Sequence, residues 1–130
     1  MRPVVNRSTT LRSMTFAEWD AAPSAFDVVV ALDVVEHAGL GMHGDPLDPN
    51  GDLAAMAMLK KMVGAEGLLL LAIPIGIDRL VFNATRVYGR VRLPILLDGW
   101  TTVQSAGFKY NLLFDAGTTR PVMLLRQGAA

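Results

Sequence analysis

Two short apolar runs constrain the fold of this chain more than any other feature. The first, FDVVVAL at residues 26–32, is rich in β-branched residues and does not alternate between apolar and polar positions. The second, LLLLAI at residues 68–73, has the same character and is followed by Pro74. Runs without alternation are typical of strands that are buried on both faces of a parallel sheet. We therefore expect an α/β domain with both strands buried.

The segment between the two runs predicts a helix over residues 52–63. Asn50 or Asp52 could cap its start, and Gly64 or Gly67 could end it. A strand, a helix and a second strand in succession form a βαβ unit. Such a unit implies a parallel pair of strands with a right-handed crossover.

The remaining elements are shorter and are predicted from local composition. Late apolar segments could pair as an antiparallel hairpin, with residues 109–119 between them, and a proline could begin a short helix. Residues 81–92 fit neither a helix nor a strand clearly. The expected elements are a short strand at 10–14, a turn or short helix at 15–19, a helix at 93–97, and strands at 100–104 and 121–126.

Length and composition bound the class of protein. The chain has 130 residues, which suggests one domain, and 12 basic residues balance 12 acidic ones. No basic stripe is visible, so we expect no nucleic-acid partner. No apolar stretch approaches the roughly 20 residues of a spanning helix, and the first ten residues have no apolar signal core. We expect no membrane span and a cytoplasmic location.

Acidic residues and a histidine follow the first predicted strand. Ligands bind beyond the carboxyl ends of the strands in open α/β sheets, which places Asp33, Glu36 and His37 near one crevice together with Asp78, which follows the second strand. Histidine titrates near neutrality, so Glu36 and His37 could act as an acid/base pair. The alternative is a hydrogen-bonded turn with no chemical function. Asp33 could contact substrate or cofactor, or it could only cap the turn.

The loop over residues 37–51 is rich in glycine, proline and aspartate. Its length favours either function or disorder. Gly39 and Gly41 could allow a cofactor to approach the backbone, or they could only permit positive φ angles. His43 and Asp45 could contact substrate or, with His37 and Asp48, hold a metal ion. Their spacing matches no standard metal motif, so no metal is expected.

A second polar segment lies at residues 83–90. Arg86 could clamp a carboxylate or phosphate, and Asn83 and Tyr88 could bind hydroxyl groups. The alternative is a solvated surface with Tyr88 packed against it.

These residues carry a family resemblance. FDVVVALDVVEH, the following helix and LKKMVGAEGLLLLAIP resemble the fourth strand, fourth helix and fifth strand of class I S-adenosylmethionine-dependent methyltransferases. EHAGLGMHGDPLDPNGD and FNATRVYGRVRL resemble the methyltransferase-like family known as domain of unknown function 268. The resemblance covers roughly residues 26–108. Thr85 stands where the family pattern leads us to expect histidine.

The resemblance implies a partial Rossmann-like sheet, mostly parallel, with a C-terminal antiparallel hairpin. It also implies an S-adenosylmethionine cofactor. However, the glycine turn that would hold this cofactor is absent, because no glycine precedes Gly39. We expect residues 1–130 to form a single domain whose first strands are missing, with residues 1–25 as a remnant of the preceding strand region. A homodimer or a complementary chain could then cover the exposed sheet edge.

Three functions follow as hypotheses. The first is a methyltransferase-like protein that acts on a small acceptor, such as a glycan hydroxyl, and that could be inactive alone. The second is a non-catalytic remnant or interaction subunit, and the third is a metal-dependent hydrolase. The expected catalytic residues are Asp33, Glu36 and His37, the substrate-binding residues are His43, Asp45, Asn83, Arg86 and Tyr88, and the cofactor-binding residues are Asp33, Gly39 and Gly41.

Overall fold

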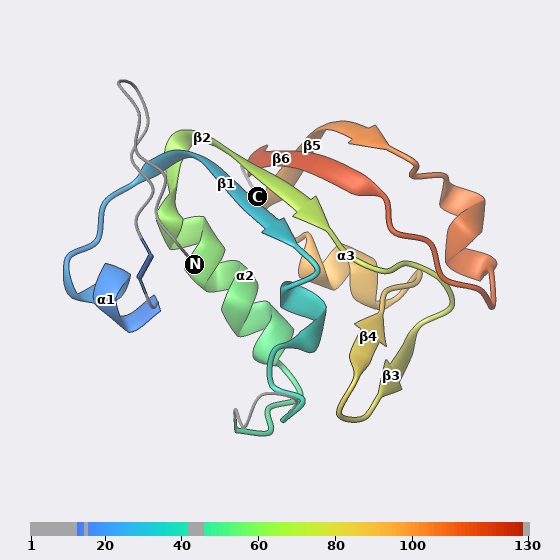
Figure 1. The fold of residues 1–130 in the computed structure, drawn as a ribbon. Coiled ribbons are helices and arrows are strands. Elements are labelled where there is room, and N and C mark those ends of the chain that lie inside the picture. Colours follow the sequence, from blue (N-terminus) through green and yellow to red (C-terminus); the bar gives the residue numbers. More distant parts are fainter. Residues whose placement is uncertain (1–12, 15, 42–45, 129–130) are drawn as a thin grey trace.

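The computed structural model describes residues 13–14, 16–41 and 46–128 (Figure 1). A four-stranded sheet has the order β1-β2-β6-β5, and β3 and β4 form a separate two-stranded sheet. The strands are β1 (Phe26–Leu32), β2 (Val63–Ala72), β3 (Arg79–Val81), β4 (Thr85–Val87), β5 (Trp100–Ala106) and β6 (Val122–Gln127). The α-helices are α1 (Phe16–Ala21), α2 (Gly51–Met62) and α3 (Arg92–Leu96), and the 3₁₀ helices are η1 (Val35–His37) and η2 (Tyr110–Phe114).

The predicted βαβ unit is confirmed as β1, α2 and β2. β1 and β2 pair in parallel, from Val28 opposite Leu68 to Leu32 opposite Ala72. The expected caps of α2 are wrong in detail. Asn50 makes no side-chain capping bond, and the helix passes directly into β2 at Val63, before either candidate glycine.

The C-terminal hairpin is also confirmed. β5 and β6 pair antiparallel, from Trp100 opposite Gln127 to Ala106 opposite Val122. The expectation that most neighbouring strands of the sheet pair in parallel is wrong. Within the described four-stranded sheet, β1 and β2 are the only parallel pair, because β6 lies between β2 and β5 and runs antiparallel to both.

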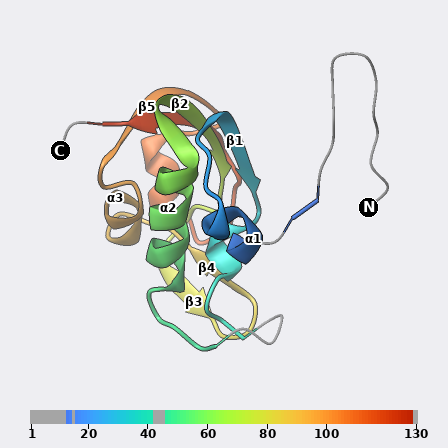
Figure 2. The same ribbon diagram turned by 90° about the vertical axis from the view of Figure 1, so that its left-hand side faces the viewer.

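The core lies on one side of the four-stranded sheet. Figures 1 and 2 show α2 and α3 on the same side. Met56 of α2 and Leu93 and Leu96 of α3 belong to one buried cluster with Leu71 of β2 and Leu125 of β6. This cluster packs α2 and α3 against the sheet, and the candidate site begins at the carboxyl end of β1 in that sheet.

The prediction that β1 is buried on both faces is wrong for the described part of the chain. Ala31 is 2% exposed on the helix-covered face, whereas Val28, Val30 and Leu32 are 56%, 57% and 48% exposed on the other. No described helix packs over that second face. The row of apolar side chains is therefore open, although its composition is that of a buried strand.

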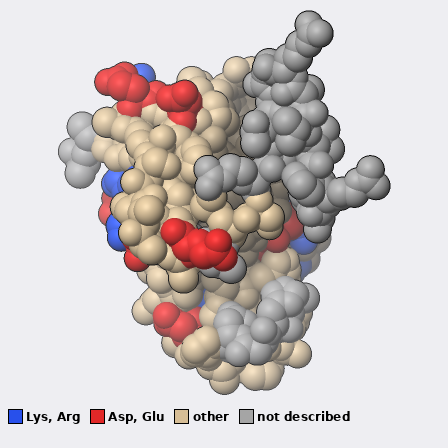
Figure 3. All heavy atoms as spheres, turned by 60° about the vertical axis from the view of Figure 1, so that its left-hand side comes forward, with Lys and Arg blue, Asp and Glu red and all other residues tan. Residues whose placement is uncertain are grey.

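The described surface has few concentrations of charge. In the view of Figure 3, most of the described surface belongs to residues other than Lys, Arg, Asp and Glu, and the charged groups are scattered. None of the helices in the described ranges has the length and apolar character needed to span a membrane.

Candidate functional site

The carboxyl end of β1 begins the candidate site. The chain leaves the strand through Asp33, whose φ of 57° lies in the left-handed region that few side chains other than Asp and Asn adopt readily. This bend leads into η1, where Glu36 is fully buried. The sharp turn thus brings the side chain of a strand-end aspartate close to that of a buried glutamate three positions later.

Arg120 joins these two carboxylates. Its Nη1 donates to Oε2 of Glu36 at 2.9 Å and also to the carboxylate of Asp33. The side chains of Arg120 and Asp33 are 44% and 56% exposed, whereas that of Glu36 is 0% exposed. One guanidinium therefore neutralises a buried carboxylate and at the same time reaches solvent.

His37 extends the cluster. Its Nδ1 lies 2.5 Å from the carbonyl oxygen of Ala84, and its Nε2 lies 3.8 Å from Oε2 of Glu36. A carbonyl oxygen can only accept, so Nδ1 carries the hydrogen. In the neutral imidazole, Nε2 then presents a lone pair. A proton received there would form a cation beside the carboxylate of Glu36.

One oxygen of Glu36 has no hydrogen-bond partner among the described residues. It is Oε1, which is fully buried, while Oε2 accepts from Arg120. An unpaired buried carboxylate oxygen is costly, and such atoms mark strain or function. The structure thus brings together Asp33, Glu36 and His37, the three residues expected to be catalytic.

The two glycines expected at the cofactor follow η1 in the chain. Gly39 and Gly41 both have positive φ, at 77° and 75°. A Cβ atom on Gly39 would collide with the carbonyl oxygen of Asp48 and lie 3.1 Å from Cα of Gly51. The backbone at Gly39 is therefore packed against the start of α2.

Arg86 lies on β4 and is 4% exposed. Its Nη1 donates to the carbonyl oxygen of Ala38 at 2.5 Å, and its Nη2 donates to that of Asp48 at 3.0 Å. It makes longer bonds of 3.4 Å to the carbonyls of Glu36 and Pro49. Arg86 thus ties both ends of the loop over residues 37–51 to β4, and its donors are used within the chain.

Tyr88 and Asp52 form a buried pair. The Tyr88 hydroxyl donates to Oδ2 of Asp52 at 2.8 Å, and both side chains are fully buried. Arg92 Nη2 donates to the two Asp52 oxygens at 3.2 and 3.1 Å, and Arg86 Nε lies 3.8 Å from Oδ2. Burial, and then the charge of Asp52, raise the pKa of Tyr88 well above its ordinary value.

Asp78 organises the start of α3. Its carboxylate accepts from the backbone N–H groups of Gly89, Val91 and Arg92 at 2.8 to 2.9 Å. Partial burial opposes ionisation. The hydrogen bonds from Val91, Arg92 and Gly89, together with the charge of Arg92, outweigh it and hold the pKa of Asp78 below its ordinary value.

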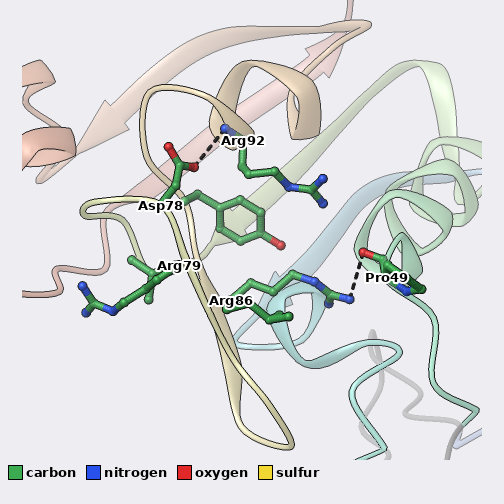
Figure 4. Close-up of a pocket in the computed structure, with 8 residues that line it drawn as sticks. Pro49, Asp78, Arg79, Arg86 and Arg92 are labelled. Atoms are coloured by element: carbon green, nitrogen blue, oxygen red, sulfur yellow. Dashed lines mark hydrogen bonds between the residues drawn. The ribbon is translucent and has the colours of Figure 1, made fainter.

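A cavity of about 310 Å³ lies between these groups. Figure 4 shows Arg86 and Arg92 extending in the same direction, whereas Arg79 points the opposite way. Arg79 donates to the carbonyl of Ala116 at 2.9 Å and to Oγ1 of Thr118 at 2.6 Å. The lining residues are Pro49, Asp78, Arg79, Leu80, Arg86, Val87, Tyr88 and Arg92.

The remaining predicted residues lie elsewhere. Asn83 is exposed in the turn between β3 and β4, with a φ of 59°. His43 and Asp45 lie outside the described residues. Among the described residues, no group of three or more His, Asp or Glu side chains is arranged to hold a metal ion.

Three residues of the site were not predicted to have a part in it. Arg120 lies 84 positions from Glu36, and no spacing rule links them. Arg92 was expected only as the end of an irregular segment. For Asp52 the sequence predicted only a helix cap, although a carboxylate in a strongly apolar helix is itself a signal that a cationic or hydroxyl partner is present.

One protein family matches the chain over residues 4–118, and it is described as Caenorhabditis protein of unknown function, DUF268. The chain belongs to this family. The matched segment of this DUF268 protein contains the residues around Glu36 and those around Asp52. The exception is Arg120, which lies two residues beyond the matched segment. No curated protein matches the chain.

Proposed function

We propose that this DUF268 chain is the acceptor-side part of a methyltransferase-like protein, in which His37 removes a proton from a hydroxyl group of a small acceptor. One observation carries the proposal. The bond from Nδ1 of His37 to the carbonyl of Ala84 directs the hydrogen to that nitrogen and leaves Nε2 free to accept a proton.

The surroundings of His37 suit a general base. Its side chain is 25% exposed, so a small acceptor can approach. The Glu36 carboxylate, 3.8 Å from Nε2, would stabilise the imidazolium formed by proton transfer. Methyl transfer itself depends mainly on holding the acceptor in line with the methyl donor, so a base and a fixed acceptor pocket are the main contributions that a protein supplies on this side.

The residues of this chain do not fit an S-adenosylmethionine cradle. The backbone of Gly39 is packed against Asp48 and Gly51, and Asp33 is paired with Arg120. The proposal therefore assigns to these residues the binding and deprotonation of the acceptor only. It derives no step from the cofactor.

The test measures label transfer from tritiated S-adenosylmethionine to a panel of small hydroxyl compounds. The wild-type chain and His37→Gln are compared, each alone and with an extract of the expressing cells that could supply a complementing chain. We expect transfer with the wild type in the extract arm and a loss of at least about 100-fold with His37→Gln. No transfer in either arm would overturn the proposal.

A second candidate function is self-association through β1. In the described part of the chain, β1 has β2 as its only neighbour in the sheet, and Val28, Val30 and Leu32 are exposed beside this free edge. A second copy paired antiparallel about Val29 would place Val28 opposite the second copy's Val30. The same apolar row would then continue across the pair.

Light scattering after size exclusion tests this candidate. The wild type should elute with the mass of two 14.0 kDa chains. Val30→Lys should be monomeric, because a lysine on the edge opposes pairing. Val103→Lys, at a residue of β5 that is 51% exposed, is the matched control and should remain a dimer. A monomeric wild type would exclude the candidate.

A further inference from the structure

Two guanidinium groups meet one buried carboxylate at Asp52. Asp52 is fully buried and is a carboxylate that both Arg86 and Arg92 contact. Asp78 also lines the cavity, but its carboxylate accepts from backbone N–H groups at the start of α3. Anion binding in this cavity therefore depends on whether either guanidinium keeps donors that no other group uses.

Arg92 is the residue with donors to spare. Nη1 and Nη2 of Arg86 donate to backbone carbonyls of η1 and of the loop over residues 37–51, and its Nε lies 3.8 Å from the Asp52 carboxylate. Arg92 uses only Nη2 for Asp52, and its Nε and Nη1 have no hydrogen-bond partner among the described residues. Its side chain is 33% exposed and lies in the cavity wall (Figure 4).

The rest of the wall is largely apolar. Leu80, Val87 and Pro49 line the cavity together with the ring of Tyr88. A volume of about 310 Å³ is at the lower end of the range for small-molecule pockets. One guanidinium with unused donors beside an apolar wall suits a monoanion with an apolar body better than a dianion such as phosphate.

We propose that this cavity binds a small organic carboxylate, with the carboxylate on Arg92 and the apolar body against Leu80 and Val87. This inference deepens the proposed function, because it makes the acceptor a carboxylate-bearing molecule held beside β4. Ala84, which binds His37, directly precedes that strand. Its test measures binding alone, so its failure is distinguishable from failure of methyl transfer.

The probe is benzoate, and binding is followed by the NMR shifts of backbone and arginine side-chain N–H groups. Benzoate should bind saturably and shift the signals of Arg92 and Tyr88. Benzamide, which has the same shape without the charge, should bind at least tenfold more weakly, and inorganic phosphate should also bind more weakly. Equal binding of benzamide, tighter binding of phosphate, or no saturation by benzoate would each overturn the proposal.

Substitutions at Arg92 test the assigned cation. Arg92→Gln should weaken benzoate binding at least tenfold, and Arg92→Lys should weaken it less, because lysine keeps the charge but loses the planar pair of donors. Arg90→Gln is the control, since Arg90 is exposed and lies over the ring of Phe114, outside this cavity. Unchanged affinity in Arg92→Gln would overturn the assignment.

A second pair of variants leaves the Asp52 cluster intact. Leu80 lines the cavity and is 59% exposed, whereas the neighbouring Val81 is 44% exposed and lies outside it. Leu80→Asp would put a negative charge at the cavity and should weaken benzoate binding at least fivefold. Val81→Asp adds the same charge on the same strand and should leave the affinity unchanged. Equal effects of the two variants would contradict the proposed location.

Discussion

Nδ1 of His37 lies 2.5 Å from the carbonyl oxygen of Ala84, which joins η1 to the turn before β4 across 47 positions of sequence. This contact determines which ring nitrogen carries the hydrogen of the neutral imidazole. It also explains why Nε2, rather than Nδ1, lies on the side of Glu36.

The first prediction is that neutral His37 exists as the Nδ1–H tautomer. Long-range nitrogen–proton NMR distinguishes the two tautomers. The chain has only two histidines, so His37→Gln assigns the signals. Free histidine favours the other tautomer, and an Nε2–H signal for His37 in the folded chain would show that the bond to Ala84 does not form.

The second prediction concerns Arg120. Arg120→Gln removes the cation that faces Asp33 and the buried Glu36. Because the guanidinium is partly exposed, we expect a loss of about 1–3 kcal/mol in the free energy of unfolding, measured by urea denaturation. Arg126→Gln, on the exposed face of β6, is the control and should change it by less than about 0.5 kcal/mol.

A double variant separates charge from packing at this position. If the cost of Arg120→Gln arises from an unpaired Glu36 carboxylate, Glu36→Gln in the same chain should restore part of the lost stability. Equal stability of the Arg120→Gln and Arg126→Gln chains would show that the ion pair contributes nothing.

The third prediction concerns alkaline pH. The pKa of Tyr88 is raised in the folded chain by burial and by Asp52, so the folded state holds its phenolic proton more tightly than the unfolded state. The stability that Tyr88 contributes is therefore fully present below about pH 10, the ordinary tyrosine pKa, and is lost as the pH rises above it. Denaturation over an alkaline pH series measures this loss.

Tyr88→Phe should abolish most of that dependence and cost about 1.5–3 kcal/mol at neutral pH, because it removes a hydrogen bond to a buried carboxylate. Tyr110→Phe is the matched control, since Tyr110 is 63% exposed. Ultraviolet titration of the Tyr110→Phe chain should show that Tyr88 ionises at a higher pH in the folded chain than in the unfolded chain. Ionisation of Tyr88 at the same pH in both states would refute the assignment.

The fourth prediction concerns acidic pH and Asp78. Its pKa is lowered in the folded chain, so its contribution to stability is present above about pH 4, the ordinary aspartate pKa, and is lost as the pH falls through the lowered value. Asp78→Asn should cost about 1–2 kcal/mol at neutral pH, because one acceptor oxygen is replaced by a donor.

The difference between Asp78→Asn and the wild type should shrink as the pH falls. Asp98→Asn, at an exposed position near the end of α3, serves as the control and should change the free energy of unfolding at neutral pH by less than about 0.5 kcal/mol. A difference that is constant from neutral to acidic pH would mean that the charge of Asp78 is not responsible.

The sequence by itself determined the local elements. The apolar runs located β1 and β2, the segment between them located α2 to within one residue at each end, and the late segments were correctly paired as an antiparallel hairpin. The position of Asp33, Glu36 and His37 after a strand was enough to predict that they share one end of the sheet. These features depend on periodicity and on neighbours a few residues apart, which a single sequence displays.

Only the tertiary structure decided which side chains pair and which faces are covered. Arg120 reaches Glu36 from 84 positions away, and Arg86, predicted as a ligand clamp, is occupied by carbonyls of its own chain while Arg92 keeps free donors. β1 has the composition of a fully buried strand, yet in the described chain one of its faces is open. Burial and ion pairing depend on segments distant in sequence, and composition alone carries no information about them.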